Sequence, residues 1–200
     1  MNITSNNLPV YITIYTILSS INTTNLTEHY FPNNLEYSQT DQIELSYNYI
    51  RSINAYAFRH LESFEGRLIL TYNYIQYLSP YAFDNLYLLT NLSLANNSIE
   101  ILTWKHFQHL EQLHELDLSY NRLEKLSNHT FRYLINLQIL RLNNNPLKFI
   151  DSNVFTNLTH LKEIHLHGSQ IIQNLDPLHS YWLWNLANLH LNYLLNTKYV

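Results

Sequence analysis

A repeat of about 24 residues constrains the fold of this chain more than any other feature of its sequence. It is clearest from Leu113 to Asn136, which reads LHELDLSYNRLEKLSNHTFRYLIN. Apolar residues stand at relative positions 1, 4, 6, 11, 14, 19 and 22, with an asparagine at position 9. This spacing fits neither a single helix nor a single strand. It indicates a coil in which a short strand, an asparagine turn and a return limb bury their apolar residues in one core, as stacked repeats do.

The pattern recurs along most of the chain. Asparagines follow one another at intervals of 25, 24, 24 and 24 residues, at Asn48, Asn73, Asn97, Asn121 and Asn145. A phenylalanine comes ten residues after each of them, at Phe58, Phe83, Phe107, Phe131 and Phe155. Each unit opens with paired Leu or Ile residues, from Ile43 and Leu45 to Ile164 and Leu166.

Stacking assigns a role to each column. We expect the paired apolar residues to head strands of a parallel sheet, and the phenylalanines to fill the core under the return limbs. The asparagines should form a buried structural ladder, because an amide donates and accepts hydrogen bonds at once. The one extra residue, near Gly66, is expected to form a small bulge before its strand.

Composition excludes several classes of function. The 200 residues are 46% hydrophobic and 13% charged, with a formal net charge of −4, which is typical of one folded domain and provides no basic stripe for nucleic acid. The absence of cysteine excludes disulfides and thiolate chemistry, and two glycines provide no phosphate-binding loop. No catalytic arrangement stands out from the repeat, so we predict neither an enzyme nor a cofactor or metal site.

Both ends depart from the repeat. Residues 1–42 are expected to form a degenerate N-terminal cap without cysteines, in which the apolar stretch Leu8 to Ile21 alternates at a strand period. This alternation favours a capping strand over a degraded signal segment. Residues 43–172 should hold about five and a half repeats, and residues 173–200 a degenerate last repeat or C-terminal cap. Alternatively, the chain is a fragment whose neighbours continue the stack.

The pattern LxxLxLxxNxLxxLxxxxFxxLxx resembles the 24-residue typical class of leucine-rich repeat, found in Toll-like receptor ectodomains, Slit and the small leucine-rich proteoglycans. The resemblance covers about Ile43 to Ile172. It implies an α/β solenoid, or horseshoe, with a parallel β-sheet on the concave face and short helical or irregular return limbs on the convex face. It also implies a module that binds a protein ligand or co-receptor within an extracellular receptor, immune-recognition, adhesion or matrix protein.

In such a solenoid the outward strand positions form the concave face. The side chains predicted to contact a partner there are Glu44, Tyr47, Tyr72, Ser93, Asn96, Asp117, Ser119, Tyr120, Arg141, Asn143, His165 and His167. Tyrosines on a rigid polar sheet are typical of protein-binding hot spots, although tyrosine also simply suits a strand surface. We expect Asp117 and Arg141 to pair across adjacent strands. His165, His167 and His190 should face the same way, which leaves a metal or pH-sensing cluster open, although no carboxylate or cysteine completes a recognisable ligand spacing.

N-glycosylation sequons bear on the compartment. Seven occur, at Asn2, Asn22, Asn25, Asn91, Asn96, Asn128 and Asn157, and chance would supply about half of them in so asparagine-rich a chain. Asn128 and Asn157 should lie on exposed return limbs, whereas a glycan on Asn96 would obstruct a partner.

We therefore predict an extracellular or cell-surface protein-binding module that does not insert into a membrane within this chain, and we leave a homodimer open. A cytoplasmic scaffold or adaptor is the alternative, favoured by the absence of cysteines and of a clean signal peptide. A repeat-built enzyme should carry rows of acidic residues or metal ligands, which the sequence does not show.

Overall fold

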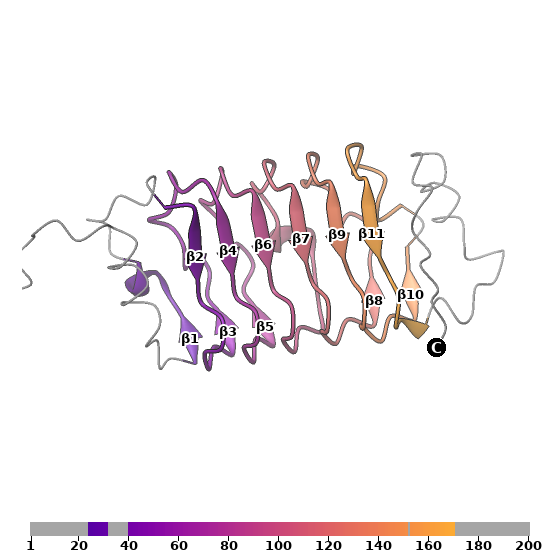
Figure 1. Cartoon of the computed structure of the whole chain (residues 1–200), viewed down its shortest axis with the longest axis horizontal. Coiled ribbons are helices and arrows are strands. Elements are labelled where there is room, and N and C mark those ends of the chain that lie inside the picture. Colours follow the sequence, from indigo (N-terminus) through magenta and orange to yellow (C-terminus); the bar gives the residue numbers. More distant parts are fainter. Residues whose placement is uncertain (1–23, 32–39, 152, 171–200) are drawn as a thin grey trace, which may run out of the picture.

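A six-stranded parallel sheet dominates the computed structural model, which describes residues 24–31, 40–151 and 153–170. Its strands follow the order β11-β9-β7-β6-β4-β2. They are β2 (Gln42–Glu44), β4 (Arg67–Ile69), β6 (Asn91–Ser93), β7 (Glu115–Asp117), β9 (Ile139–Arg141) and β11 (Glu163–His165). Equivalent residues of successive repeats face one another, as Leu92 faces Leu116. The predicted solenoid with a sheet on its concave face is confirmed, and Figure 1 shows the strands side by side in one row.

The return limbs carry shorter elements in a second row (Figure 1). The strands β1 (Asn25–Leu26), β3 (Ser52–Ile53) and β5 (Tyr77–Leu78) form one parallel sheet, and β8 (Lys125–Leu126) pairs with β10 (Phe149–Ile150). Two 3-10 helices, η1 (Glu28–Tyr30) and η3 (Trp104–His106), complete the limbs, and no α-helix occurs within the described residues. The predicted short helical or irregular return limbs are therefore confirmed.

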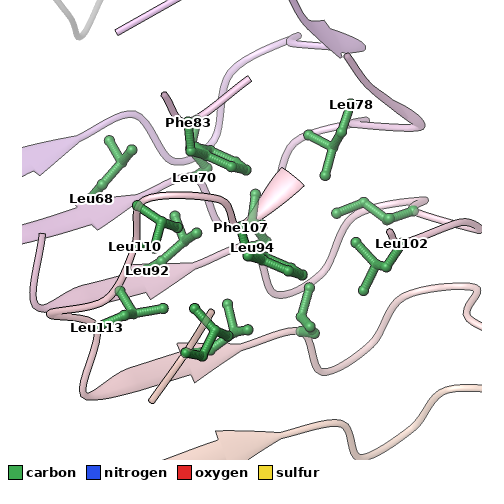
Figure 2. Packing of buried hydrophobic residues seen from close by; sticks show 14 of the residues in the cluster. Leu68, Leu70, Leu78, Phe83, Leu92, Leu94, Leu102, Phe107, Leu110 and Leu113 are labelled. Atoms are coloured by element: carbon green, nitrogen blue, oxygen red, sulfur yellow. The ribbon is translucent and has the colours of Figure 1, made fainter. Parts of the chain in front are cut away.

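The core lies between these two rows. The five repeat phenylalanines are each at most 2% exposed. Phe58 stacks on Phe83 with ring centroids 5.7 Å apart, and Phe131 stacks on Phe155 at 6.3 Å, whereas Phe107 is tilted against Phe131. Figure 2 shows Phe83 and Phe107 between Leu92 of the main sheet and the return-limb residues Leu78 and Leu102. Because every repeat contributes one ring to this column, no repeat can bury its apolar face without its neighbours.

The first full repeat has a cover from the preceding segment. Phe31 is 1% exposed, and its ring centroid lies 5.1 Å from that of Phe58. Arg59 and Glu28 form an ion pair at 3.1 Å across the same junction. The segment before the repeats thus extends the phenylalanine column by one ring.

The ladder asparagines connect successive turns. Asn121 donates from Nδ2 to the carbonyl of Leu118 in its own repeat at 3.1 Å and to that of Leu94 in the preceding repeat at 2.9 Å. Its Oδ1 accepts the backbone N–H of Ile99 at 2.9 Å. Side chains that repeat this arrangement are Asn73, Asn97 and Asn145.

The two ends of the ladder differ. Asn48 donates to the carbonyls of Leu45 and Ser46, both in its own repeat. Ser169 replaces asparagine in the last described repeat and donates from Oγ to Leu166. The inter-repeat bonds are therefore concentrated in the central turns.

Gly66 accommodates the extra residue in the first interval between ladder asparagines, which is 25 residues long where the others are 24. A Cβ at this position would lie 2.3 Å from the carbonyl oxygen of Asp41, so no other residue fits without a shift of backbone. The expected bulge does not interrupt the sheet, because β2 and β4 pair continuously, with Gln42 opposite Arg67. The extra residue is absorbed before β4 begins.

Several predictions concern residues outside the described ranges. These are the capping strand or signal segment at Leu8 to Ile21, the sequons Asn2 and Asn22, the C-terminal region 173–200 and His190. Within the described ranges, no helix has both the length and the apolar character needed to cross a membrane.

Candidate binding surface

The concave surface consists of the outward side chains of the main sheet and of the turn that follows each strand. In β7, Leu116 is buried while Glu115 and Asp117 on either side of it are partly exposed, and the other strands follow the same alternation. We call one row of the following turn the tyrosine column. It contains Tyr47, Tyr72, Asn96, Tyr120, Asn144 and Gly168.

The tyrosine column has a left-handed backbone. Its φ values are 57° at Tyr47, 54° at Tyr72, Asn96 and Tyr120, and 55° at Asn144. These residues were expected on the strands, but they lie in the turns after them. Left-handed backbone costs a residue with a Cβ about 1–2 kcal/mol, which asparagine and glycine reduce. Tyrosine nevertheless occupies the column at Tyr47, Tyr72 and Tyr120.

Hydrogen bonds hold the column in register. The backbone N–H of Tyr72 donates to Ala95 at 3.1 Å, that of Asn96 to Ser119 at 3.0 Å, and that of Tyr120 to Asn143 at 3.0 Å. With the same φ and the same ladder bond, the side chains of Tyr72, Asn96 and Tyr120 leave the backbone in the same direction. The surface they form is therefore rigid.

Tyrosine rings form two stacks, one in the turn and one directly after it. Tyr47 and Tyr72 have ring centroids 4.7 Å apart and planes 10° apart, and they are 76% and 49% exposed. Tyr49 and Tyr74 form the second stack, with ring centroids 6.2 Å apart and ring planes 6° apart. The second pair was not predicted. Its signal in the sequence is the segment YNYI, which occurs at 47–50 and at 72–75 with a buried ladder asparagine between the two tyrosines.

The predicted ion pair between Asp117 and Arg141 is wrong. Arg141 pairs with Glu115, whose carboxylate also accepts a hydrogen bond from Asn91 Nδ2 at 2.9 Å. One oxygen of Asp117 accepts the backbone N–H of Ser119 at 2.9 Å and its hydroxyl at 2.6 Å. Asp117 and Arg141 are opposite in register, but the longer glutamate reaches the cation while Ser119 holds the aspartate.

The other predicted contact residues differ in accessibility. Ser119 and Asn143 are only 5% and 8% exposed and offer a partner little surface. Ser93 and Glu44 are partly exposed, and Glu44 accepts the N–H of Ser46 at 2.9 Å. His165 lies 3.4 Å from the carboxylate of its strand neighbour Glu163.

His165 and His167 do not form part of a metal cluster in the described residues. No group of three or more His, Cys, Asp or Glu side chains in that part of the chain is arranged to hold a metal ion. The third predicted member, His190, lies outside it.

The sequons separate into two groups. Asn25, Asn128 and Asn157 are exposed on β1 and the return limbs. Asn91 and Asn96 lie on the concave side and are partly buried, Asn91 being bonded to Glu115 and Asn96 standing in the tyrosine column. A glycan on the first group would leave the concave surface free.

A buried histidine in η3 is the clearest electrostatic feature of the return limbs. Burial lowers the pKa of His106 to about 4, and this effect outweighs that of a hydrogen bond to the backbone of Leu78, which raises the pKa. Its Nδ1 accepts the backbone N–H of Thr103 at 3.2 Å. His106 is therefore neutral at pH 7 and serves the fold.

Comparison with known proteins agrees with this geometry. The sequence profile described as "Leucine rich repeat" matches residues 67–123 and 111–171, which together cover more than half of the chain. The chain belongs to the leucine-rich repeat family. No curated protein matches it.

A solved structure described as "Crystal structure of TLR13-ssRNA13 complex" is similar to this leucine-rich repeat chain, with 31% identity and a TM-score of 0.64. The match covers 73% of this chain and 20% of that one, so this chain spans about a fifth of its length. The predicted resemblance to Toll-like receptor ectodomains is confirmed. Proteins of this repeat class are typically interaction scaffolds, and this chain is a repeat module of that kind.

Proposed function

We propose that this leucine-rich repeat module binds a protein partner through its concave surface, as part of an extracellular receptor, immune-recognition, adhesion or matrix protein. The stacked and highly exposed rings of Tyr47 and Tyr72 are the observation that carries the proposal. Exposed aromatic side chains on a polar surface are the usual anchors of protein interfaces.

The rigidity of the surface supports the same function. Main-chain ladder bonds fix the tyrosine column, and the asparagine ladder fixes the turns directly behind it. A partner that docks on these residues orders little that is not already ordered, so more of the contact energy appears as affinity.

The charges favour a protein partner over a nucleic acid. The similar TLR13 structure is described as a complex with ssRNA13, but RNA binding depends on uncompensated cations. The charged side chains of the main-sheet strands, histidines apart, are Glu44, Arg67, Glu115, Asp117, Arg141 and Glu163. Acidic residues outnumber basic ones in this set, and Glu115 already neutralises Arg141.

The exposed sequons support an extracellular location. Asn25, Asn128 and Asn157 can each carry a glycan without covering the tyrosine column, because they lie on the limbs and on β1. A cytoplasmic scaffold would use the same concave surface, but its sequons would remain unmodified.

Site-specific photo-crosslinking tests the proposal on the full chain. A photoreactive amino acid would replace Ser93, in the middle of the main sheet, or Thr156, exposed on a return limb. On cells that secrete the chain, we expect one protein to be captured from position 93 and not from position 156. Capture from position 156 alone, or capture of RNA in place of protein, would refute the concave-face function.

A further inference from the structure

The tyrosine column is interrupted at one position. Rings occupy it at Tyr47, Tyr72 and Tyr120, but the repeat between the last two supplies Asn96. The tyrosines on either side of this shorter residue, Tyr72 and Tyr120, are 49% and 53% exposed. Within the described part of the chain, the Asn96 side chain has no hydrogen-bond partner, so nothing ties it in place.

The ladder sets the size of this interruption. Adjacent strands lie about 4.8 Å apart, and the stacked rings of Tyr47 and Tyr72 keep nearly that spacing, at 4.7 Å. Tyr72 and Tyr120 are two strands apart, so their rings stand about 9.6 Å apart where they leave the sheet. A flat group placed midway would lie about 4.8 Å from each ring, which is within the range of cation–π and stacking contacts.

Charge selects the kind of flat group. Asp117 stands on β7 in the repeat of Tyr120, and it has no cationic partner among the described residues because Arg141 pairs with Glu115. The chain as a whole carries a formal net charge of −4. A planar cation in the interruption would therefore be favoured by the two tyrosine rings and by the negative charge that Asp117, which has no ion-pair partner within the described ranges, leaves on β7.

The same chain shows such a contact elsewhere. On the return limbs, the guanidinium carbon of Arg132 lies 4.9 Å from the ring centroid of Tyr133 and 5.4 Å from that of Trp104. Both distances are slightly longer than the half-spacing of about 4.8 Å available above Asn96. Lysine lacks the plane that stacks on a ring, and a neutral aromatic side chain would leave Asp117 uncompensated.

We propose that an arginine side chain of the protein partner fills the interruption above Asn96, with its guanidinium between Tyr72 and Tyr120 and its charge opposed by Asp117. The proposal rests on the concave-face function and narrows it to a partner that presents an exposed arginine. A glycan on Asn96 occupies the same space, so a chain glycosylated there does not accept the arginine.

Two substitutions at position 96 separate the effect from a change in folding. Asn96→Tyr completes the column, and the backbone tolerates it because tyrosine already adopts the same φ of 54° at Tyr72 and Tyr120. Asn96→Gly keeps the space open and suits a left-handed backbone. Both remove the sequon, which makes them a matched pair.

Nuclear magnetic resonance titration of the full, unglycosylated chain at low ionic strength provides the measurement. The probes are N-acetyl-L-argininamide and, as the matched control, N-acetyl-L-lysinamide. We expect saturable shifts of Tyr72, Tyr120 and residue 96, with the arginine probe binding about two- to fivefold more tightly than the lysine probe. Asn96→Tyr should abolish these shifts, and Asn96→Gly should retain them.

Equal binding of the two probes, or arginine shifts that persist in Asn96→Tyr, would overturn the inference. Its failure is distinguishable from failure of the proposed function. If a partner is captured from position 93 while the arginine probe does not bind, the arginine inference falls and the concave-face function stands. If the probe binds but the partner is captured from position 156 alone, the concave-face function is refuted. The claim that a partner's arginine binds above Asn96 is then refuted as well.

Discussion

Removal of one ladder asparagine should destabilise the chain by an amount that the structure specifies. Asn121→Ala breaks four hydrogen bonds, but their consequences differ. The carbonyl of Ser119 keeps the backbone N–H of Asn96 as a donor, at 3.0 Å. The carbonyls of Leu94 and Leu118 each keep a second asparagine donor, Asn97 at 3.0 Å and Asn145 at 2.9 Å. The buried N–H of Ile99 loses its side-chain acceptor. The cost is therefore dominated by one orphaned donor, and we expect a loss of about 1–3 kcal/mol in the free energy of unfolding.

Asn48→Ala is the matched control for this prediction. The hydrogen bonds of Asn48 stay within its own repeat, and Leu45, one of its two acceptors, keeps Asn73 as a donor. We expect a loss of about 0.5–1 kcal/mol. Denaturant melts followed by circular dichroism measure both variants. A loss in Asn121→Ala no larger than that in Asn48→Ala would refute the reasoning that the ladder stabilises the turns between repeats.

Three further predictions follow from single side chains. His106 is neutral in the fold, so stability should be constant above pH 6.5 and fall by about 3 kcal/mol as the pH drops towards the lowered pKa of about 4. Denaturant melts across this range should show a smaller fall in His106→Thr, and an equal fall would contradict the assignment. Thr40 buries a hydroxyl without a hydrogen-bond partner in the described residues, so Thr40→Val should stabilise the chain by about 1 kcal/mol; a lower melting temperature would contradict this. Expression in secretory cells should add glycan mass that Asn128→Gln and Asn157→Gln remove, whereas an unglycosylated cytosolic product would count against the extracellular assignment.

Positions that every repeat must copy could be predicted from the sequence. A leucine, phenylalanine or asparagine that recurs at a fixed interval has the same neighbours in each turn, so its period alone reveals its burial. The sheet, its register and the phenylalanine column follow from that argument. Gly66 departs from the period, and its role depends on the backbone of Asp41, which the sequence does not reveal.

Side-chain choices within a column could not be predicted in this way. Arg141 has two carboxylates within reach, and the partner it adopts depends on side-chain length and on the competing bond from Ser119 to Asp117. The left-handed backbone of Tyr72 does not follow from the sequence, because tyrosine rarely adopts that conformation. The burial of His106 was visible in principle, since equivalent positions of other repeats hold Ala57, Ala82, Thr130 and Val154, all buried.

The proposed function places binding specificity in the residues that break the repeat. Membership of the leucine-rich repeat family establishes the scaffold. The leucines and asparagines that define the repeat are buried, so they are not available to a partner. Tyr47, Tyr72, Asn96 and Tyr120 share one backbone conformation and differ only in side chain. Such a column can change its ligand without changing the fold.

The affinity of the partner captured from position 93 tests the concave-face function most directly. The double variant Tyr72→Asn and Tyr120→Asn should keep the native backbone conformation, because asparagine already occupies the same column at Asn96 with a φ of 54°. Tyr56→Asn is the control, since Tyr56 is an exposed return-limb tyrosine with a φ of 57°. We predict that the double variant weakens binding at least about thirtyfold, as expected for the loss of hot-spot residues, while Tyr56→Asn leaves the Kd unchanged. An unchanged Kd in a folded double variant would contradict the account.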